Sequence, residues 1–290
     1  MYSLLKLISW IFEFIPRKYA LLLGRKLGSF FYYFIPIRKA IAVKNISIAF
    51  PELNKKERTK LLYSTYQHFG MVLIDFLRLN KYKREKDINL VKIPSESIKL
   101  FKENNGGILL SAHLGNWEYL GSSLGLHEIQ CVGVAQIQHS NGANTFFNEL
   151  RESKMTKIIS VNAGSKMMIK SMIDGAYLGL ISDQNAGKKG SSATFFGTQV
   201  SVPKGVGVFH VKTNFPILLG FCILLPDFSY DLSFELLDFK DLPNNIDEAV
   251  KIINQKYTML LEQKIKEYPS QYFWFHRKWP KKIYKGLSNF

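Results

Sequence analysis

Cysteine is scarce in this chain of 290 residues, and two copies are too few for a disulfide-stapled fold. Cys131 and Cys222 each lie inside an apolar run, CVGVA and ILLGFCILL, which predicts buried free thiols. No set of His, Cys, Asp and Glu residues has the spacing of a zinc site. We therefore expect the protein to use neither a metal nor another cofactor.

Long uncharged apolar runs are also missing. No such run reaches 18 residues, so the sequence does not predict a membrane-spanning helix. No small-x-small cleavage site follows the apolar N-terminal part, and we expect the bulk of the chain to stay on the cytoplasmic side of a membrane. Repeats of 20 to 50 residues are absent, and 47% of the residues are hydrophobic. The length suits one large folded domain with a terminal appendage.

Acidic residues are few: 23 against 39 Lys and Arg, for a formal charge of +16. Such a balance indicates an anionic partner, namely nucleic acid, a membrane surface, or an acidic carrier or substrate. Residues 1–39 hold seven basic residues and one acidic residue among apolar runs such as LLKLISWIFEFI and LGSFFYYFIPI. A segment that is both basic and apolar favours a membrane surface over nucleic acid as the partner. We predict a membrane-associated helical segment at 1–40, lying on the bilayer or inserted obliquely, and a folded domain at 41–290.

Hydrophobic periodicity predicts the fold class. Asn54 and Glu57 have capping-box spacing before an amphipathic helix, and a final helix covers roughly 246–267. From Gly107 onward, short β-like runs alternate with helical patterns: GILLS, CVGVA, KIISV and LGLIS each precede a helical segment or a Gly-rich loop. PILLGFCILL is typical of a strand buried on both faces, and YDLSFELLDF of an edge strand. The pattern predicts an α/β fold with a mostly parallel central sheet flanked by helices, in which late strands can be antiparallel.

The run ILLSAHLGNWEYLG places His113 at the end of a predicted strand and Glu118 five residues later. Ligand sites of parallel sheets gather at the carboxyl ends of strands, where Asp183 also falls. An imidazole with a carboxylate partner is the arrangement of a general base that deprotonates a hydroxyl. The alternative is a histidine that only satisfies local hydrogen bonds.

Further motifs decide between these interpretations. HLGNWE resembles the H-x4-D/E motif of the lysophospholipid acyltransferase superfamily, and its Gly-Asn-Trp filling resembles the branch that contains the lipid A late acyltransferases. Four other blocks resemble that family in the same order: KNISIAFPELNKKER, FFNELRES, GLISDQNAGKKGSSATFFG and QYFWFHRKWP. The resemblance extends from about residue 5 to residue 280. Gln136 and Gln138, Asp75 and the Asp-Gln-Asn triplet at 183–185 depart from the family pattern, which leaves the acceptor open.

The resemblance implies an acyltransferase in which His113 is the base and Glu118 its orienting carboxylate. It implies Arg151 and Asp183 as substrate-binding residues, although Arg151 also suits an ion pair with a carboxylate such as Asp183. Backbone N–H groups of Gly115 and Asn116 are suitable oxyanion donors, so Asn116 joins the substrate-binding set.

By the same resemblance, the donor is acyl carrier protein or acyl-CoA, and the acceptor is an anionic glycolipid, a lipid A precursor. The implied location is the cytoplasmic face of the inner membrane, with no nucleic-acid partner. The same chemistry on another phosphoglycolipid or aminolipid is the alternative acceptor. A nucleic-acid-binding protein, suggested by the charge alone, is a distant alternative because no basic stripe on one polar helix is visible.

Overall fold

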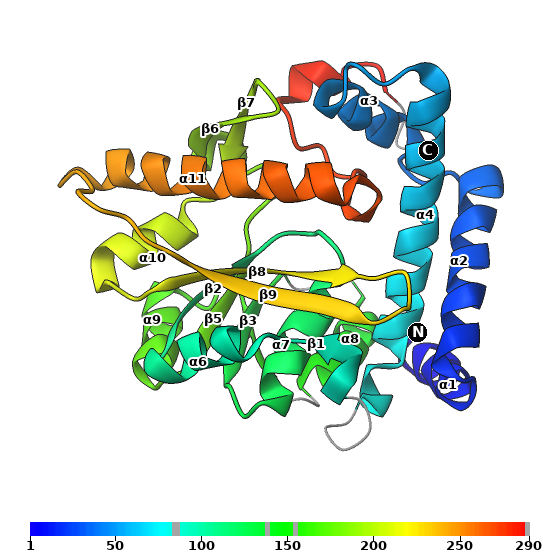
Figure 1. Cartoon of the computed structure of the whole chain (residues 1–290), viewed down its shortest axis with the longest axis horizontal. Coiled ribbons are helices and arrows are strands. Elements are labelled where there is room, and N and C mark those ends of the chain that lie inside the picture. The colour runs from blue at the N-terminus through cyan, green and yellow to red at the C-terminus, as the bar shows by residue number, and fades with distance from the viewer. Residues whose placement is uncertain (83–87, 137–139, 153–155, 288–290) are drawn as a thin grey trace.

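The computed structural model describes residues 1–82, 88–136, 140–152 and 156–287 (Figure 1); Gln138 lies outside these ranges. Within them, a seven-stranded sheet has the order β1-β9-β8-β2-β5-β3-β4. Strands β8, β2, β5, β3 and β4 run parallel, β9 is antiparallel to β8, and β1 runs parallel to β9. The strands are β1 (Val91–Lys92), β2 (Gly107–Ser111), β3 (Cys131–Ala135), β4 (Thr156–Ser160), β5 (Tyr177–Ile181), β8 (Ile217–Leu224) and β9 (Tyr230–Leu237). The predicted α/β fold with a mostly parallel sheet is confirmed.

Helices cover both faces of the sheet (Figure 1). In β2, Ile108 and Leu110 pack into one buried cluster, and Leu109 packs into the other. Both faces are therefore buried, as the uninterrupted apolar strands predicted. The helices are α1 (Tyr2–Phe14), α2 (Arg17–Phe34), α3 (Lys39–Ala49), α4 (Lys55–Leu77), α6 (Ser95–Glu103), α7 (Trp117–Leu126), α8 (Asn141–Glu152), α9 (Ser165–Ile173), α10 (Gly205–Thr213) and α11 (Ile246–Glu267).

Several local predictions are confirmed. The side chain of Asn54 accepts from the backbone N–H of Glu57, and the Glu57 carboxylate accepts from the backbone N–H of Asn54, which closes the capping box of α4. Helix α11 has the predicted bounds, and both cysteines are buried free thiols. The expected Gly-rich loop after β5 instead contains an antiparallel hairpin, β6 (Ser191–Phe195) and β7 (Thr198–Val202). Alternate burial along β6 explains the hairpin, and Phe195 is part of the core.

Helix α2 lies along the outer side of α4 (Figure 1), and small residues permit the close approach. A Cβ atom at Gly28 would lie 2.1 Å from the backbone oxygen of Tyr66, and one at Gly70 would lie 2.1 Å from that of Gly24. Any larger side chain there would force the two helices apart. The predicted boundary at residue 40 falls just after the start of α3, and the division into two domains stays a prediction.

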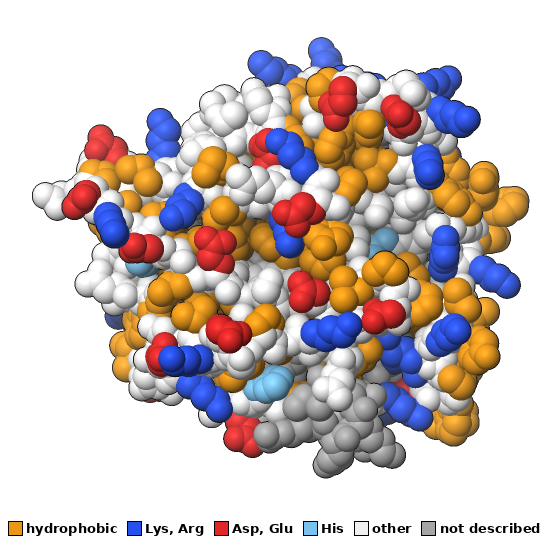
Figure 2. All heavy atoms as spheres, in the orientation of Figure 1, with side chains coloured by type: hydrophobic (Ala, Val, Ile, Leu, Met, Phe, Trp, Pro, Cys, Tyr) orange, Lys and Arg blue, Asp and Glu red, His pale blue; other side chains and the backbone are white. Residues whose placement is uncertain are grey.

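Exposed apolar side chains concentrate on the two N-terminal helices. Figure 2 shows them along the edge of the molecule that α1 and α2 form, with Lys and Arg side chains between them. They are Leu4, Leu7, Trp10, Ile11 and Phe14 on α1, and Tyr19, Leu23, Phe30, Tyr33 and Phe34 on α2. Among the described residues, no helix combines the length and apolar character that crossing a bilayer requires.

Candidate active site

Two adjacent parallel strands bring His113 and Asp183 together. Ser111 of β2 pairs with Ile181 of β5, so both side chains lie two residues beyond paired strand ends. His113 Nδ1 lies 2.7 Å from Asp183 Oδ1. The Asp183 carboxylate is buried, whereas the His113 side chain keeps 18% of its surface exposed. An oriented imidazole with access to solvent is the arrangement that a general base requires.

The contact with Asp183 determines which nitrogen of His113 carries the proton. An ionised carboxylate only accepts hydrogen bonds, so Nδ1 of His113 must donate to it. Gln184 Nε2 lies 2.9 Å from His276 Nε2 and 3.4 Å from His113 Nε2. The proton of neutral His113 is therefore on Nδ1, where it is donated to Asp183, and the Nε2 lone pair points toward Gln184.

Charges around the pair keep Asp183 ionised. Burial alone would raise the pKa of Asp183, but the neighbouring His113 imidazole and Lys278 hold it well below its usual range. Lys278 is itself buried, and its Nζ donates to the backbone oxygen of Asp183. Burial lowers the pKa of Lys278 to about 8, against the opposing effect of Asp183. A permanently ionised Asp183 is suited to stabilise an imidazolium at His113.

Glu118 does not orient His113, contrary to the expectation from the motif. Its carboxylate accepts two hydrogen bonds from Arg151, at 2.7 Å from Nε and 2.6 Å from Nη2. The bidentate pair joins α7 to α8, so the ion pair that was the alternative role of Arg151 is present, with Glu118 as its partner in place of Asp183. Burial would lower the pKa of Arg151, but Glu118 raises it above its ordinary value. Trp117 links the two pairs, because its Nε1 lies 3.2 Å from Glu118 Oε1 and its ring centroid 4.7 Å from that of His113.

The backbone donors expected at Gly115 and Asn116 are already engaged. Gly115 N donates to Gln271 O at 2.9 Å, and Asn116 N donates to Cys222 O at 2.7 Å. The side chain of Asn116 is fully buried, with its amide donating to Tyr230 at 2.9 Å. The expectation that these two N–H groups are free to bind an oxyanion is therefore wrong. Local sequence could not reveal this contact, because Cys222 belongs to β8 and is distant from Asn116 along the chain.

Two residues near His113, Gln184 and His276, were not identified by sequence reasoning, whereas Lys278 was expected to face phosphates or the carrier and is instead buried against Asp183. His276 lies with its ring centroid 5.2 Å from that of His113, and Gln184 and Lys278 contact the same pair. Burial, with a smaller effect of His113, lowers the pKa of His276 to about 4. The block QYFWFHRKWP supported the family resemblance as a whole motif, and the sequence analysis gave its histidine no role. His276 lies five residues after the end of the 3-10 turn Pro269–Gln271, and no periodic signal in the sequence would place it.

His68 supports the turn that follows His113, and it makes stability depend on pH. Its Nε2 donates to Gly115 O at 3.3 Å, and burial lowers its pKa to about 4 from 6.5. Between these values the unfolded chain binds a proton that the folded protein does not, so stability falls as pH decreases from about 6.5 toward 4. We expect His68 to account for about 2 kcal/mol of unfolding free energy lost between pH 7 and pH 5.

Urea titrations of the wild type and of His68→Gln at both pH values measure this contribution. Glutamine keeps a donor for Gly115 O but does not titrate. The loss of unfolding free energy between pH 7 and pH 5 should therefore be smaller in His68→Gln by the contribution assigned to His68. Equal pH dependence in the two proteins would contradict the assignment.

The described residues contain no group of three or more His, Cys, Asp or Glu side chains that could hold a metal ion. The site consists of the His113–Asp183 pair, the Glu118–Arg151 pair, and the polar side chains of Gln184 and His276.

Comparisons with known proteins agree with the family resemblance found in the sequence. The family model for the bacterial lipid A biosynthesis acyltransferases matches residues 1–281. The lipid A biosynthesis palmitoleoyltransferase of Escherichia coli strain K12 is 22% identical over 281 residues, which cover 93% of this chain and 88% of that protein. The lipid A biosynthesis acyltransferase of Shigella flexneri shows the same identity and coverage. The matched segment includes every residue of the site described above.

Proposed function

Because the chain belongs to the bacterial lipid A biosynthesis acyltransferase family, we propose that it moves a fatty acyl chain from a thioester donor to a hydroxyl of a lipid A precursor, with His113 as the general base. The observation that carries this proposal is the 2.7 Å contact of the partly exposed His113 with the buried Asp183. It supplies a correctly protonated imidazole at the carboxyl end of the sheet, where such sites lie.

The steps follow from this geometry. His113 Nε2 takes the proton of the acceptor hydroxyl as its oxygen attacks the thioester carbonyl carbon, and Asp183 stabilises the imidazolium. The tetrahedral intermediate then collapses: the new C–O ester bond remains, the C–S bond breaks, and the thiolate takes the proton from His113. Oxyanion donors are available in the first turn of α7, which the side chain of Asn116 does not cap. No protein residue is acylated in this scheme.

The donor is acyl carrier protein or acyl-CoA, and the acceptor is an anionic glycolipid. Both carry negative charge, which complements the formal charge of +16. Another phosphoglycolipid or an aminolipid is the alternative acceptor, since the chemistry at His113 requires only a nucleophilic group. Arg151, bound to Glu118, is proposed to hold α7 and α8 in the geometry that receives the substrate.

Purified full-length protein, incubated with a lipid A precursor and either acyl carrier protein thioester or acyl-CoA, tests the proposal. Mass spectrometry should detect a product heavier by one acyl chain, and the two donor arms identify the carrier. A phosphoglycolipid and an aminolipid in parallel reactions test the alternative acceptors. Absence of acylated product with every donor and acceptor would contradict the proposed function.

Helices α1 and α2 are proposed to attach the protein to the cytoplasmic face of the inner membrane. On α1, exposed Leu7, Trp10 and Phe14 share a surface with Leu4 and Ile11. Apolar side chains with basic residues nearby favour an interface with anionic lipids.

Replacing Leu7, Trp10 and Phe14 together by Gln should reduce sedimentation with anionic vesicles at least tenfold. The apolar surface that drives attachment is lost, while the thermal midpoint should change little because these side chains are exposed. The matched control replaces Ile173, Ile252 and Met259, which are equally exposed on α9 and α11. Equal loss of binding in both triple variants would place the attachment surface elsewhere.

A further inference from the structure

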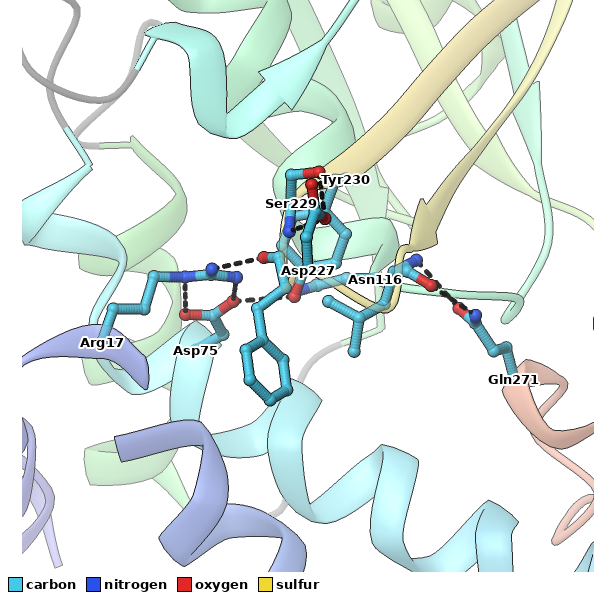
Figure 3. Close-up of polar contacts among 9 residues, drawn as sticks. Arg17, Asp75, Asn116, Asp227, Ser229, Tyr230 and Gln271 are labelled. Carbon is cyan, nitrogen blue, oxygen red and sulfur yellow. Dashed lines mark hydrogen bonds and ion pairs between the residues drawn. The ribbon is translucent and has the colours of Figure 1, made fainter. Parts of the chain in front are cut away.

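A buried chain of polar contacts connects the N-terminal helices to the turn that carries His113 (Figure 3). Arg17, the first residue of α2, donates from Nε to Asp75 Oδ1 at 2.9 Å and from Nη2 to Asp75 Oδ2. The hydroxyl of Tyr230 lies 2.7 Å from Asp75 Oδ2, and Asn116 Nδ2 lies 2.9 Å from the same hydroxyl. Asp75, Tyr230 and Asn116 are completely buried.

The direction of every hydrogen bond in this chain is determined. An ionised Asp75 only accepts, so the Tyr230 hydroxyl must donate to it. The hydroxyl oxygen is then the acceptor for the Asn116 amide. The contacts thereby fix the orientation of the Asn116 side chain, three residues after His113.

The turn between His113 and α7 has little freedom to adopt another shape. Gly115 has a φ of +68°, and a Cβ atom there would lie 1.9 Å from Cys222 O. Phe273 N donates to the backbone oxygen of His113 at 2.9 Å. Strand β8 and the C-terminal segment thus hold the turn by its backbone. The contact of Asn116 with Tyr230 is a side-chain contact that leads from this turn toward the N-terminal helices.

The end of α4 and the connection between β8 and β9 contact the chain around the junction of α1 and α2. Arg78, at the end of α4, donates from Nη1 to the backbone oxygens of Phe12 and Ile15. Arg17 also donates to the backbone oxygen of Phe228, in the connection between β8 and β9. Asp75 therefore connects the position of helices α1 and α2 to the position of β9, because it accepts from both Arg17 and Tyr230.

We infer that Arg17, Asp75 and Tyr230 are positioning residues, which act through Asn116 to hold the His113 turn in its reactive geometry and make turnover depend on the seating of α1 and α2. The inference rests on the proposed function of the site. Asp75 and Tyr230 are completely buried and therefore cannot touch a substrate. Their effect passes through the hydrogen bond to Asn116.

Stability alone is a weak explanation for this arrangement. A buried ion pair is often no more stabilising than well-packed apolar side chains of similar volume, because both charges lose their hydration. An aligned hydrogen-bonded chain instead specifies direction, and a small misplacement of a catalytic group is costly for turnover. The feature that apolar packing could not supply is the fixed orientation of Asn116.

Tyr230→Phe tests the inference, because it removes one hydroxyl and keeps the ring against Tyr119. We expect turnover at saturating substrate to fall about 10- to 100-fold, with KM within twofold of the wild type. Tyr177→Phe is the matched control: Tyr177 is a buried tyrosine of β5 whose hydroxyl donates to Phe101 O at 2.8 Å, away from the turn. Tyr177→Phe should lose about as much stability as Tyr230→Phe and keep the turnover of the wild type. Arg17→Lys should reproduce part of the loss, and combining it with Tyr230→Phe should add little.

Amide hydrogen exchange of the peptide covering 113–119 supplies a readout that does not depend on acyl transfer. Exchange there should be faster in Tyr230→Phe and unchanged in Tyr177→Phe. If the wild-type protein transfers no acyl chain, the proposed function is wrong. The exchange result still decides whether Tyr230 positions the turn. The inference is overturned if Tyr230→Phe leaves turnover and exchange as in the wild type. It is equally overturned if the two tyrosine variants lose the same turnover.

Discussion

His113→Ala should lower turnover by roughly 10²–10⁴-fold, the range typical of removing a general base. Without the imidazole, the acceptor hydroxyl must lose its proton to water as it attacks the thioester. The remaining activity would come from substrate binding and oxyanion stabilisation. The fold should persist, because the side chain is partly exposed and lies beyond the end of β2.

Steady-state transfer of a radiolabelled acyl chain measures this loss, with circular dichroism to verify folding. His210→Ala is a suitable control, since His210 lies on α10 and its Nδ1 contacts Phe215 O at 2.8 Å. It should keep turnover within a factor of two. Retention of more than a tenth of wild-type turnover by folded His113→Ala would remove His113 from the role of base.

Asp183→Asn should have a loss of similar size, about 10²–10⁴-fold, although it changes hardly any atom position. The amide of an asparagine at this place would donate to His113 Nδ1 instead of accepting from it. The imidazole proton would then move to Nε2, and the lone pair that takes the hydroxyl proton would disappear. The charge that stabilises the imidazolium would be lost as well.

The imidazole nitrogen resonances of His113 separate this effect from a general disturbance. In the neutral imidazole of the wild type, Nδ1 should be protonated and Nε2 unprotonated, and Asp183→Asn should reverse the two. Glu118→Gln is the control, because Glu118 is bound to Arg151 at 2.6 and 2.7 Å. This substitution should leave the His113 tautomer unchanged. A tautomer that reverses in Glu118→Gln and not in Asp183→Asn would restore the pairing first expected from the motif.

Local chemistry predicted much of the fold. The capping box at Asn54 and Glu57, the apolar strand runs and the helix at 246–267 depend on neighbours in the sequence, and the structure has them where they were expected. The β6–β7 hairpin was missed because its glycines and serines suggested a loop, although Ala193 and Phe195 alternate with polar residues.

The partner of His113 could not be obtained in the same way. Glu118 is close in sequence, but the start of α7 directs it toward Arg151. Asp183 was placed at a strand end, yet its contact with His113 depends on β2 and β5 being neighbours in the sheet, which a single sequence does not reveal. His276 arrives from the C-terminal segment through an isolated bridge between Leu114 and Tyr272. Long-range topology decides these contacts, whereas periodicity reports only local structure.

The most direct test of the central claim is the turnover of His113→Ala, Asp183→Asn and the double variant, measured under one condition with saturating substrates. If Asp183 acts only through His113, the double variant should be hardly slower than His113→Ala alone, because residues that act as a unit are not additive. Losses that multiply in the double variant would contradict the account, since Asp183 would then contribute to transfer without His113.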